Sequence, residues 1–146
     1  MLAFVDAGLE VSIPFGENCR YDLVLDDGSQ LSRVQCKTGR LRDGTVRFST
    51  ASTYGHHPSP RETRRHYAGQ IDAFAVYCPE TEGVYLVPID EIGARSGAYL
   101  RVTRPRNGQR ERIRFASDFE IARITCAQSE HELSAAQAGH STCDAW

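Results

Sequence analysis

The segment between residues 21 and 37 carries the strongest local folding signal in the chain. Two runs with alternating apolar residues, 21–25 and 30–37, flank the tetrapeptide Asp26-Asp27-Gly28-Ser29. Asp-Gly between two such runs indicates a tight β-hairpin, because both residue types tolerate the positive φ of hairpin turns. We therefore predict a two-stranded antiparallel unit centred on Asp27-Gly28, which constrains where the polar side chains of both strands lie.

The other segments predict one α/β domain with a mixed central sheet flanked by helices, and 146 residues suffice for one core. The run 71–78 is almost continuously apolar, as expected of a strand buried on both faces. We assign residues 1–126 to this domain and residues 127–146 to a polar, disordered tail. The further predicted elements are a helix over 1–7, strands over 9–14, 45–49 and 84–88, a loop over 50–61, a short helix over 61–70, a helix over 89–95, a strand pair over 99–103 and 109–115, and a helix over 118–124.

The distribution of charge indicates a polyanionic partner, although the net charge is only −2. Residues 33–114 contain 15 Lys and Arg against 8 Asp and Glu, whereas the rest of the chain contains 2 against 11. Affinity for phosphate depends on local positive surface rather than on total charge. The middle of the chain is therefore a candidate nucleic-acid surface, and the alternative is a solvated arginine-rich surface without a ligand.

Other whole-chain features favour an intracellular protein. No apolar run approaches the length of a membrane span, and residues 1–6 lack the basic start and long apolar stretch of a signal peptide. The five cysteines are odd in number and show no C-x-x-C spacing, which argues against a disulfide framework and against a zinc site. We expect a cytoplasmic protein with free thiols and without membrane contact.

One face of the predicted hairpin collects polar side chains that suit phosphodiester chemistry. Gln35 and Lys37 project from the same face because side chains alternate along a strand, whereas Cys36 points to the other face and is expected in the core. With the turn centred on Asp27-Gly28, Asp22 lies roughly opposite Arg33 and diagonal to Gln35. A carboxylate, an amide oxygen and an ammonium are thus predicted to share one site.

This combination predicts a divalent cation site. Mg²⁺, or alternatively Mn²⁺, takes oxygen ligands, and Asp22, the Gln35 side-chain oxygen and the Cys36 backbone carbonyl are the candidates. Such a metal binds a phosphate oxygen and lowers the pKa of a water molecule. Lys37 is the only lysine of the chain, and its compact charge could position that water or offset charge on phosphorus, a role that arginine does not share.

Four strings along the chain extend the pattern of Asp22, Gln35 and Lys37. They are Glu10-Val11-Ser12-Ile13-Pro14-Phe15-Gly16-Glu17-Asn18, Arg20-Tyr21-Asp22-Leu23, Arg33-Val34-Gln35-Cys36-Lys37-Thr38 and Asp72-Ala73-Phe74-Ala75-Val76-Tyr77-Cys78-Pro79. Together they resemble the PD-(D/E)XK nucleases, in the branch with glutamine in place of the second acid. The likeness is to the group I intron-associated endonucleases, which are homing enzymes, and it runs from about residue 3 to residue 121.

The resemblance implies a restriction-endonuclease-like core. It also implies a Mg²⁺-dependent deoxyribonuclease, which is a hydrolase acting on the ester bonds of double-stranded DNA. The expected biological role is that of a site-specific homing enzyme. Asp22 matches the metal-binding aspartate of the family, Gln35 the variable acid and Lys37 the catalytic lysine. The family usually begins with a longer helix whose glutamate completes the metal site, whereas nine residues precede Glu10 here, so this helix is expected to be truncated. Because one active site cuts one strand, double-strand cleavage implies a homodimer or a higher homo-oligomer.

Two other functions remain open at this point. A catalytically impaired DNA-binding remnant would keep the arginine-rich surface while lacking the N-terminal glutamate. A Holliday-junction or repair nuclease would share the same core and cut branched DNA without regard to sequence. Cleavage of plasmid, linear and branched DNA separates these alternatives.

Further side chains are candidates for supporting roles. Tyr67 and Asp72 precede a core strand, where they either support the active site or serve packing and capping. His56 and His57 lie in a proline-flanked loop and are more typical of exposed polar residues than of metal ligands. The arginines expected to contact DNA phosphates, or else to form a plain exposed surface, are Arg33, Arg40, Arg42, Arg61, Arg64, Arg65, Arg104 and Arg106.

Overall fold

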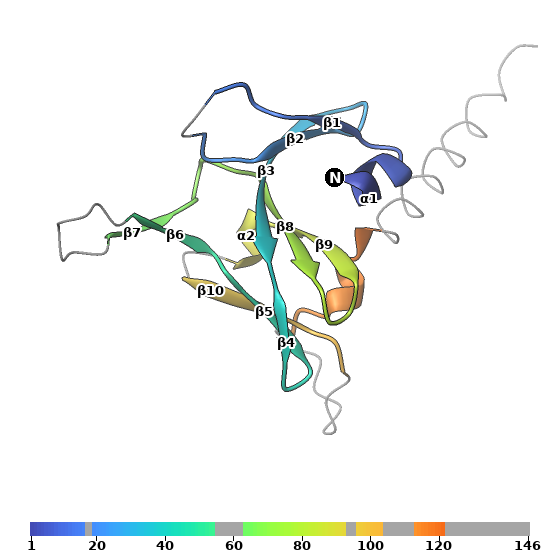
Figure 1. Cartoon of the computed structure of the whole chain (residues 1–146), viewed down its shortest axis with the longest axis vertical. Helices are drawn as coiled ribbons and strands as arrows, with labels where there is room; N and C mark the ends of the chain where they lie inside the picture. The colour runs from blue at the N-terminus through green and yellow to red at the C-terminus, as the bar shows by residue number, and fades with distance from the viewer. Residues whose placement is uncertain (17–18, 55–62, 93–95, 104–112, 122–146) are drawn as a thin grey trace, which may run out of the picture.

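A mixed five-stranded sheet forms the centre of the computed structural model, which describes residues 1–16, 19–54, 63–92, 96–103 and 113–121 (Figure 1). The strand order is β1-β2-β3-β8-β9, in which β3 and β8 run parallel and all other neighbours are antiparallel. The strands are β1 (Glu10–Ser12), β2 (Leu23–Asp26), β3 (Leu31–Thr38), β8 (Ala73–Cys78) and β9 (Gly83–Pro88). The predicted mixed sheet and the predicted hairpin of β2 and β3 are both present.

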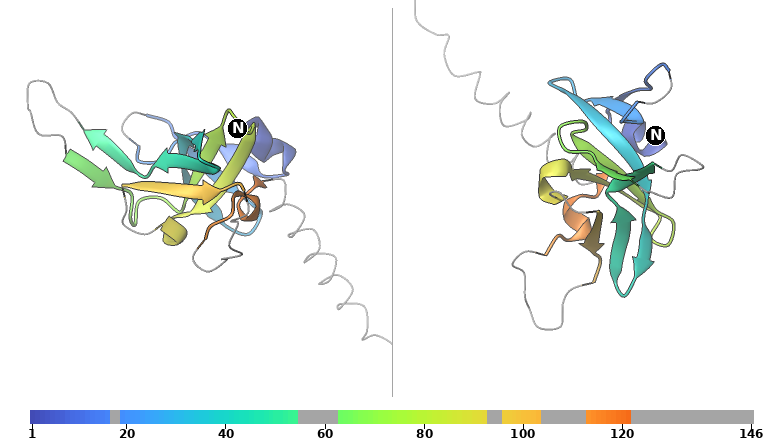
Figure 2. Two further views of the ribbon diagram at one scale, coloured as in Figure 1. Left: turned by 90° about the horizontal axis from the view of Figure 1, so that it is seen from below. Right: turned by 90° about the vertical axis from the view of Figure 1, so that its left-hand side faces the viewer.

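Strand β8 is buried on both faces, as its apolar run predicts. Ala73 and Ala75 face helix α1 (Leu2–Asp6), whose Phe4 belongs to the same apolar cluster. Phe74 and Val76 alternate with them and face a second cluster on the opposite side of the sheet. The central sheet therefore has two apolar layers, and Figure 2 shows α1 beside the edge that β1 and β2 form.

The second apolar layer is closed by a smaller antiparallel sheet of order β10-β5-β4. Its strands are β4 (Arg40–Arg42), β5 (Thr45–Ser49) and β10 (Gly97–Arg101). Val46, Phe48 and Leu100 point inward to the cluster that contains Phe74. The alternate positions of the three strands point outward, and they include Arg40, Arg42, Arg47, Tyr99 and Arg101.

Gly39 lies where the chain passes from β3 to β4 and so from one sheet to the other. A Cβ atom at this position would lie 2.6 Å from Cγ1 of Val46 and 3.0 Å from Cγ1 of Val76. Both valines are fully buried, so neither can move aside cheaply. Glycine is therefore required at this crossing because there is no room for any side chain.

The predicted loop over 50–61 and helix over 61–70 are wrong where the structure describes them. Strands β6 (Ala51–Tyr54) and β7 (Thr63–His66) pair antiparallel and project from the core (Figures 1 and 2). Each strand is only four residues long, so its own sequence carries a weak signal. The backbone pairing between the two strands, which local pattern does not reveal, determines their conformation.

The register of the β2–β3 hairpin differs from the prediction by two residues. Leu23 pairs with Val34, which places Asp22 opposite Gln35 rather than diagonal to it. The turn is longer than a two-residue Asp-Gly turn because the Asp27 carboxylate accepts hydrogen bonds from Ser29 N, Ser29 Oγ and Gln30 N at 2.9, 2.7 and 2.9 Å. A shift of two residues keeps every side chain on its predicted face.

The helices within the described ranges are short. Helix α1 agrees with the prediction, and Gly8 ends it with a φ of +80°. Helix α2 (Ile89–Ile92) opens with two acidic residues, and the rest of the predicted helix 89–95 lies outside the described ranges. None of the helices in these ranges has the length and apolar character needed to cross a membrane.

The segment after β10 also departs from the prediction. Phe115 forms a parallel bridge with Arg101, so an antiparallel partner for β10 is not found in the described part of 109–115, and β10 pairs with β5 instead. A short 3-10 helix, η1 (Ala116–Asp118), stands where the last predicted helix would begin, and Glu120 forms a bridge with Tyr85 in β9. The predicted tail over 127–146 lies outside the described residues.

Candidate active site

Asp22 directly precedes β2, and its carboxylate is fixed onto β3. Oδ2 of Asp22 accepts a hydrogen bond of 2.7 Å from the backbone amide of Cys36, and a second one from Nε2 of Gln35. The Asp22 amide donates to the carbonyl of Val34 at 2.8 Å, which extends the ladder by one residue. The hairpin therefore holds the Asp22 carboxylate next to Gln35 and Cys36, on an exposed face of the sheet.

The oxygens around the Gln35 amide form a set that suits a hard cation. Nε2 of Gln35 lies between Oδ2 of Asp22 and the carbonyl oxygen of Cys36, and its distance to the latter is 3.4 Å. Two of the three predicted ligands thus already converge on a positively polarised N–H₂ group. Rotation of the amide about its last side-chain bond exchanges this group for the oxygen Oε1 and completes the three-oxygen set.

Only one acid belongs to this set. The described residues contain no cluster of three or more His, Cys, Asp and Glu side chains, which is the commoner pattern of protein metal sites. Glu10 pairs with Asp26, four residues along β2 from Asp22, which corresponds to about 13 Å. Glu10 therefore does not supply the second acid of the site.

Lys37 projects from the same face of β3 as Gln35, and Tyr67 holds its ammonium. Nζ of Lys37 donates a hydrogen bond of 3.1 Å to the Tyr67 hydroxyl and lies 5.0 Å from the centre of the ring. Tyr67 is 4% exposed and packs edge-on against Phe74, with ring centroids 5.5 Å apart. The buried side chain of Tyr67 therefore positions the ammonium of Lys37, the only lysine of the chain, on the strand that pairs with β2.

The sequence of residues 1–122 matches the model of the PD-(D/E)XK endonuclease family. The chain belongs to this family. The fold is similar to that of a solved bacterial homing endonuclease, I-Ssp6803I, with a TM-score of 0.64 and 22% sequence identity over 97% of this chain and 90% of that chain. This likeness shows that the PD-(D/E)XK protein has the restriction-endonuclease-like α/β fold. A search of curated proteins found no match.

Arg20 was missed by the sequence analysis and lies beside the PD-(D/E)XK site. Its guanidinium carbon lies 4.2 Å from the centre of the Tyr67 ring, so one ring contacts both Arg20 and Lys37. Arg20 also donates hydrogen bonds to Ser52, His66 and Gln70. Its place in the string Arg20-Tyr21-Asp22-Leu23, two residues before Asp22, was the available signal.

Asp72 binds Arg33 in a bidentate ion pair at the start of β8. Nε and Nη2 of Arg33 donate to the two carboxylate oxygens at 3.1 and 3.0 Å, and the backbone amide of Arg33 adds a bond of 2.8 Å. The hydrogen bonds from Arg33 lower the pKa of Asp72, and the carboxylate raises the pKa of Arg33. Arg33, a candidate phosphate contact by sequence, is thus already engaged by a carboxylate.

The other candidate DNA-binding arginines are dispersed. Arg40 and Arg42 lie on the outward face of the small sheet, where Nη1 of Arg40 is 3.8 Å from a carboxylate oxygen of Glu80. Arg65 is exposed on β7. Arg61, Arg104, Arg106, the side chain of Arg64, His56 and His57 lie outside the described part of the structure.

Cys36 is exposed, so its predicted place in the core is wrong. It lies on the face of β3 that Val34 shares, as parity predicts, but the apolar cover of that face is incomplete here. A groove of about 380 Å³ runs between α1 and the ends of β3 and β8, and Cys36 and Tyr77 line it. The pKa of the Cys36 thiol is raised, although the residue as a whole is exposed. The main cause is partial desolvation of the thiol, and the nearby charge of Asp22 is the second.

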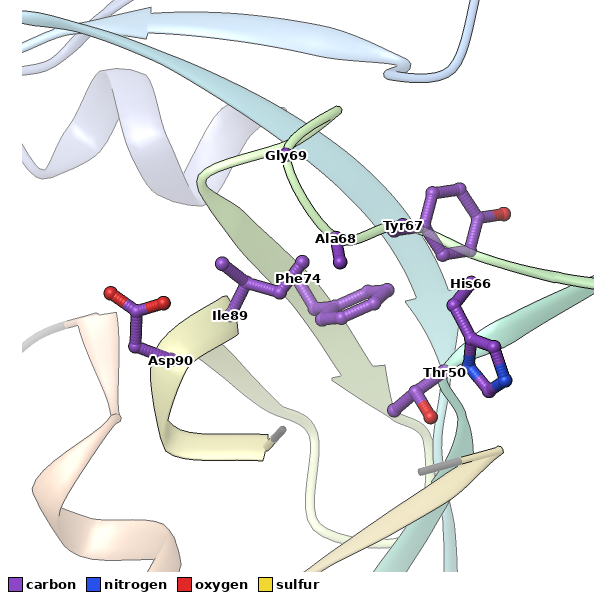
Figure 3. Close-up of a pocket in the computed structure, with 8 residues that line it drawn as sticks. All are labelled: Thr50, His66, Tyr67, Ala68, Gly69, Phe74, Ile89 and Asp90. Atoms are coloured by element: carbon purple, nitrogen blue, oxygen red, sulfur yellow. The ribbon is translucent and has the colours of Figure 1, made fainter. Parts of the chain in front are cut away.

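A separate pocket of about 220 Å³ lies next to Tyr67. Figure 3 shows the Tyr67 ring at one side of this pocket, with its hydroxyl turned away from Phe74 and Ile89. Asp22, Gln35 and Lys37 do not line it. Lys37 instead lines the groove beside α1, and Asp22 is exposed while Gln35 and Lys37 are partly exposed, so the candidate site is accessible to a large substrate. The lining residues are Thr50, His66, Tyr67, Ala68, Gly69, Phe74, Ile89 and Asp90.

Proposed function

We propose that this protein is a metal-dependent DNA endonuclease that hydrolyses phosphodiester bonds, and that it acts at a specific site as a homing endonuclease. The observation that carries the proposal is the convergence of Asp22 Oδ2, the Gln35 amide and the Cys36 carbonyl on one point of the face that also bears Lys37. Family membership supports nuclease chemistry at this position. The fold shared with a homing endonuclease supports the biological role.

In this mechanism Asp22, Gln35 and the Cys36 carbonyl would hold one divalent cation, Mg²⁺ or Mn²⁺. When bound, the cation supplies charge stabilisation at a phosphate oxygen and acidifies a water molecule. The ammonium of Lys37 donates hydrogen bonds to the attacking water or to the oxygens of the phosphate, where negative charge increases during the reaction. The Tyr67 hydroxyl keeps this ammonium on the reacting face.

Exposed arginines supply sequence-independent attraction to the DNA backbone. Arg40, Arg42 and Arg65 are the described candidates, and Arg61, Arg64, Arg104 and Arg106 are proposed on their sequence alone. Because one site cuts one strand, we also propose that a homodimer or a higher homo-oligomer cuts both strands. Residues 1–126 would form the nuclease domain, and residues 127–146 a tail.

The test is cleavage by the wild type and by Lys37→Ala, with Mg²⁺, of supercoiled plasmid, linear duplex and a four-way junction. We expect Lys37→Ala to lose about 10²- to 10³-fold in rate, the usual contribution of one positioned hydrogen-bond donor to the charge that develops in the reaction. Thr38→Ala is the matched control, since Thr38 is the next residue of β3, is exposed and points to the other face. EDTA should stop cleavage by the wild type.

Results other than the expected one would contradict the proposed site or favour a different function. Equal rates for Lys37→Ala and the wild type would remove Lys37 from the active site. Preference for the junction would favour a structure-specific repair nuclease. Binding of DNA without cleavage by any variant would favour a catalytically impaired remnant, an alternative that the single acid of the site supports.

A further inference from the structure

Arg20 connects three segments that are distant in the sequence. Nη1 donates to Oγ of Ser52 in β6 at 2.8 Å, and Nη2 donates to the carbonyl of His66 at the end of β7 at 3.1 Å. Nε donates to the side-chain oxygen of Gln70, in the turn between β7 and β8. The guanidinium is therefore fixed in position and orientation before any ligand arrives.

None of the acceptors of Arg20 carries a negative charge. They are a hydroxyl, an amide oxygen and a backbone carbonyl, and no carboxylate pairs with Arg20 among the residues that the structure describes. These bonds use three of the five N–H groups of the guanidinium, so two donors stay available within the described contacts. Among the described residues, the positive charge of Arg20 is therefore oriented without being neutralised.

A second cation lies on the same aromatic ring. The guanidinium carbon of Arg20 is 4.2 Å and Nζ of Lys37 is 5.0 Å from the centre of the Tyr67 ring. A tyrosine ring attracts each cation, but it cannot cancel their mutual repulsion. A nearby anion would lower the repulsion between the two cations, and a DNA phosphate is the anion that the proposed reaction brings to this site.

We propose that Arg20 binds a phosphate of the DNA at the active site, and that Tyr67 is a positioning residue for both Arg20 and Lys37. The inference rests on the proposed nuclease function. The planar fork of Arg20 offers its remaining N–H groups to phosphate oxygens, a geometry that arginine provides and lysine does not. Neutral anchoring by Ser52 and Gln70 keeps the full charge for the substrate.

The test measures binding of a 25-base-pair duplex of random sequence in EDTA, where cleavage does not contribute, as a function of salt concentration. Each phosphate contact contributes about 0.9 to the slope of log affinity against log salt. We expect Arg20→Gln to lower this slope by about 0.9. A fourfold rise in salt concentration should therefore weaken DNA binding by the variant about 3.5-fold less than it weakens binding by the wild type. Arg20→Lys should keep the slope while binding more weakly.

A merely structural role predicts a different pattern. Arg20→Gln and Arg20→Lys would then weaken binding equally, with the slope of the wild type, and this result would overturn the proposal. Ser52→Ala with Gln70→Ala loosens Arg20 but keeps its charge, and we expect an unchanged slope for this variant. Thermal unfolding of each variant checks that it is folded.

Two further controls separate this proposal from the proposed function. If Arg20→Gln does not fold, the side-chain Nε–H resonance of Arg20 in the wild type should shift when the duplex is added, and the absence of a shift overturns the proposal. A wild type that shows no salt-dependent DNA binding contradicts the nuclease function itself. A salt-dependent wild type with an unchanged slope in Arg20→Gln contradicts the role of Arg20 alone.

Discussion

Arg33 and Arg20 lie close to the proposed catalytic face and have opposite kinds of partner. Arg33 forms a bidentate ion pair with Asp72, which compensates its charge and ties β3 to the start of β8. Arg20 is bound by neutral acceptors and by the ring of Tyr67, so its charge is not compensated within the described residues. The first arrangement serves the fold, and the second is the one that we propose for binding a substrate phosphate.

The difference shows why counting arginines does not locate a phosphate site. By sequence, Arg33 belongs to the string around Lys37 and is the more obvious candidate, whereas Arg20 belongs to the string around Asp22. The parallel pairing of Val34 with Ala73 places Asp72 beside Arg33, and this contact spans 39 residues. The partner of an arginine therefore decides its role, and the partner comes from the tertiary fold.

Removal of the Tyr67 side chain should have the largest effect on this comparison, because it removes the support of Arg20 and leaves that of Arg33. Tyr67 is 4% exposed, so Tyr67→Ala should lower the free energy of unfolding by about 3–5 kcal/mol, as for other large buried aromatic residues. Urea unfolding followed by circular dichroism measures this loss. A loss below 1 kcal/mol would contradict the packing described for Tyr67.

Tyr67→Phe is the matched variant, since it keeps the ring and removes only the hydroxyl that binds Lys37. Its kcat for DNA cleavage should fall about tenfold to a hundredfold, the equivalent of one hydrogen bond to a charged group. Its DNA affinity in EDTA should stay unchanged because Arg20 still stacks on the ring. Equal kcat for this variant and the wild type would show that the hydroxyl does not position Lys37.

Removal of the Arg33–Asp72 pair should have a smaller effect. Both side chains are more than 40% exposed, so solvent screens the pair, and Arg33→Gln with Asp72→Asn should lower the free energy of unfolding only slightly. The salt dependence of DNA binding should equal that of the wild type, in contrast with Arg20→Gln. A slope lowered by about 0.9 would show that Arg33 leaves Asp72 to bind phosphate.

The smallest expected effect is a dependence of stability on acidic pH. The pKa of Asp72 in the folded protein is lowered by hydrogen bonds from Arg33, so the charged carboxylate stabilises the fold above its unfolded pKa of 3.8. This contribution is lost as the pH falls through the lower, folded pKa. Asp72→Asn should therefore be less stable than the wild type at pH 6, and the difference in melting temperature should shrink toward pH 2. A constant difference would contradict the lowered pKa.

The sequence alone predicts those parts of the site that depend on local geometry. The Asp-Gly turn indicates the hairpin, and strand parity places Gln35 and Lys37 on one face with Asp22 within reach. The apolar run of β8 indicates a strand covered on both sides. Even the error of two residues in the hairpin register preserves the site, because an even shift retains the faces.

Contacts between distant segments account for what the sequence does not reveal. Strands β6 and β7 are stabilised by each other, and the partners of Arg20 lie 32 to 50 residues away from it. Parity sends Cys36 away from the site, but only the position of α1 shows that this part of the face is left uncovered. Local patterns cannot indicate such contacts, because they arise from tertiary packing.

The buried crossing at Gly39 has a consequence for redesign of the protein. Two residues, Thr38 and Gly39, separate Lys37 from the first strand of the small sheet, and no side chain fits at the crossing. Insertions or bulky substitutions there would displace the lysine together with β4. A variant library should therefore vary the outward positions of β4, β5 and β10 and keep this junction and its length fixed.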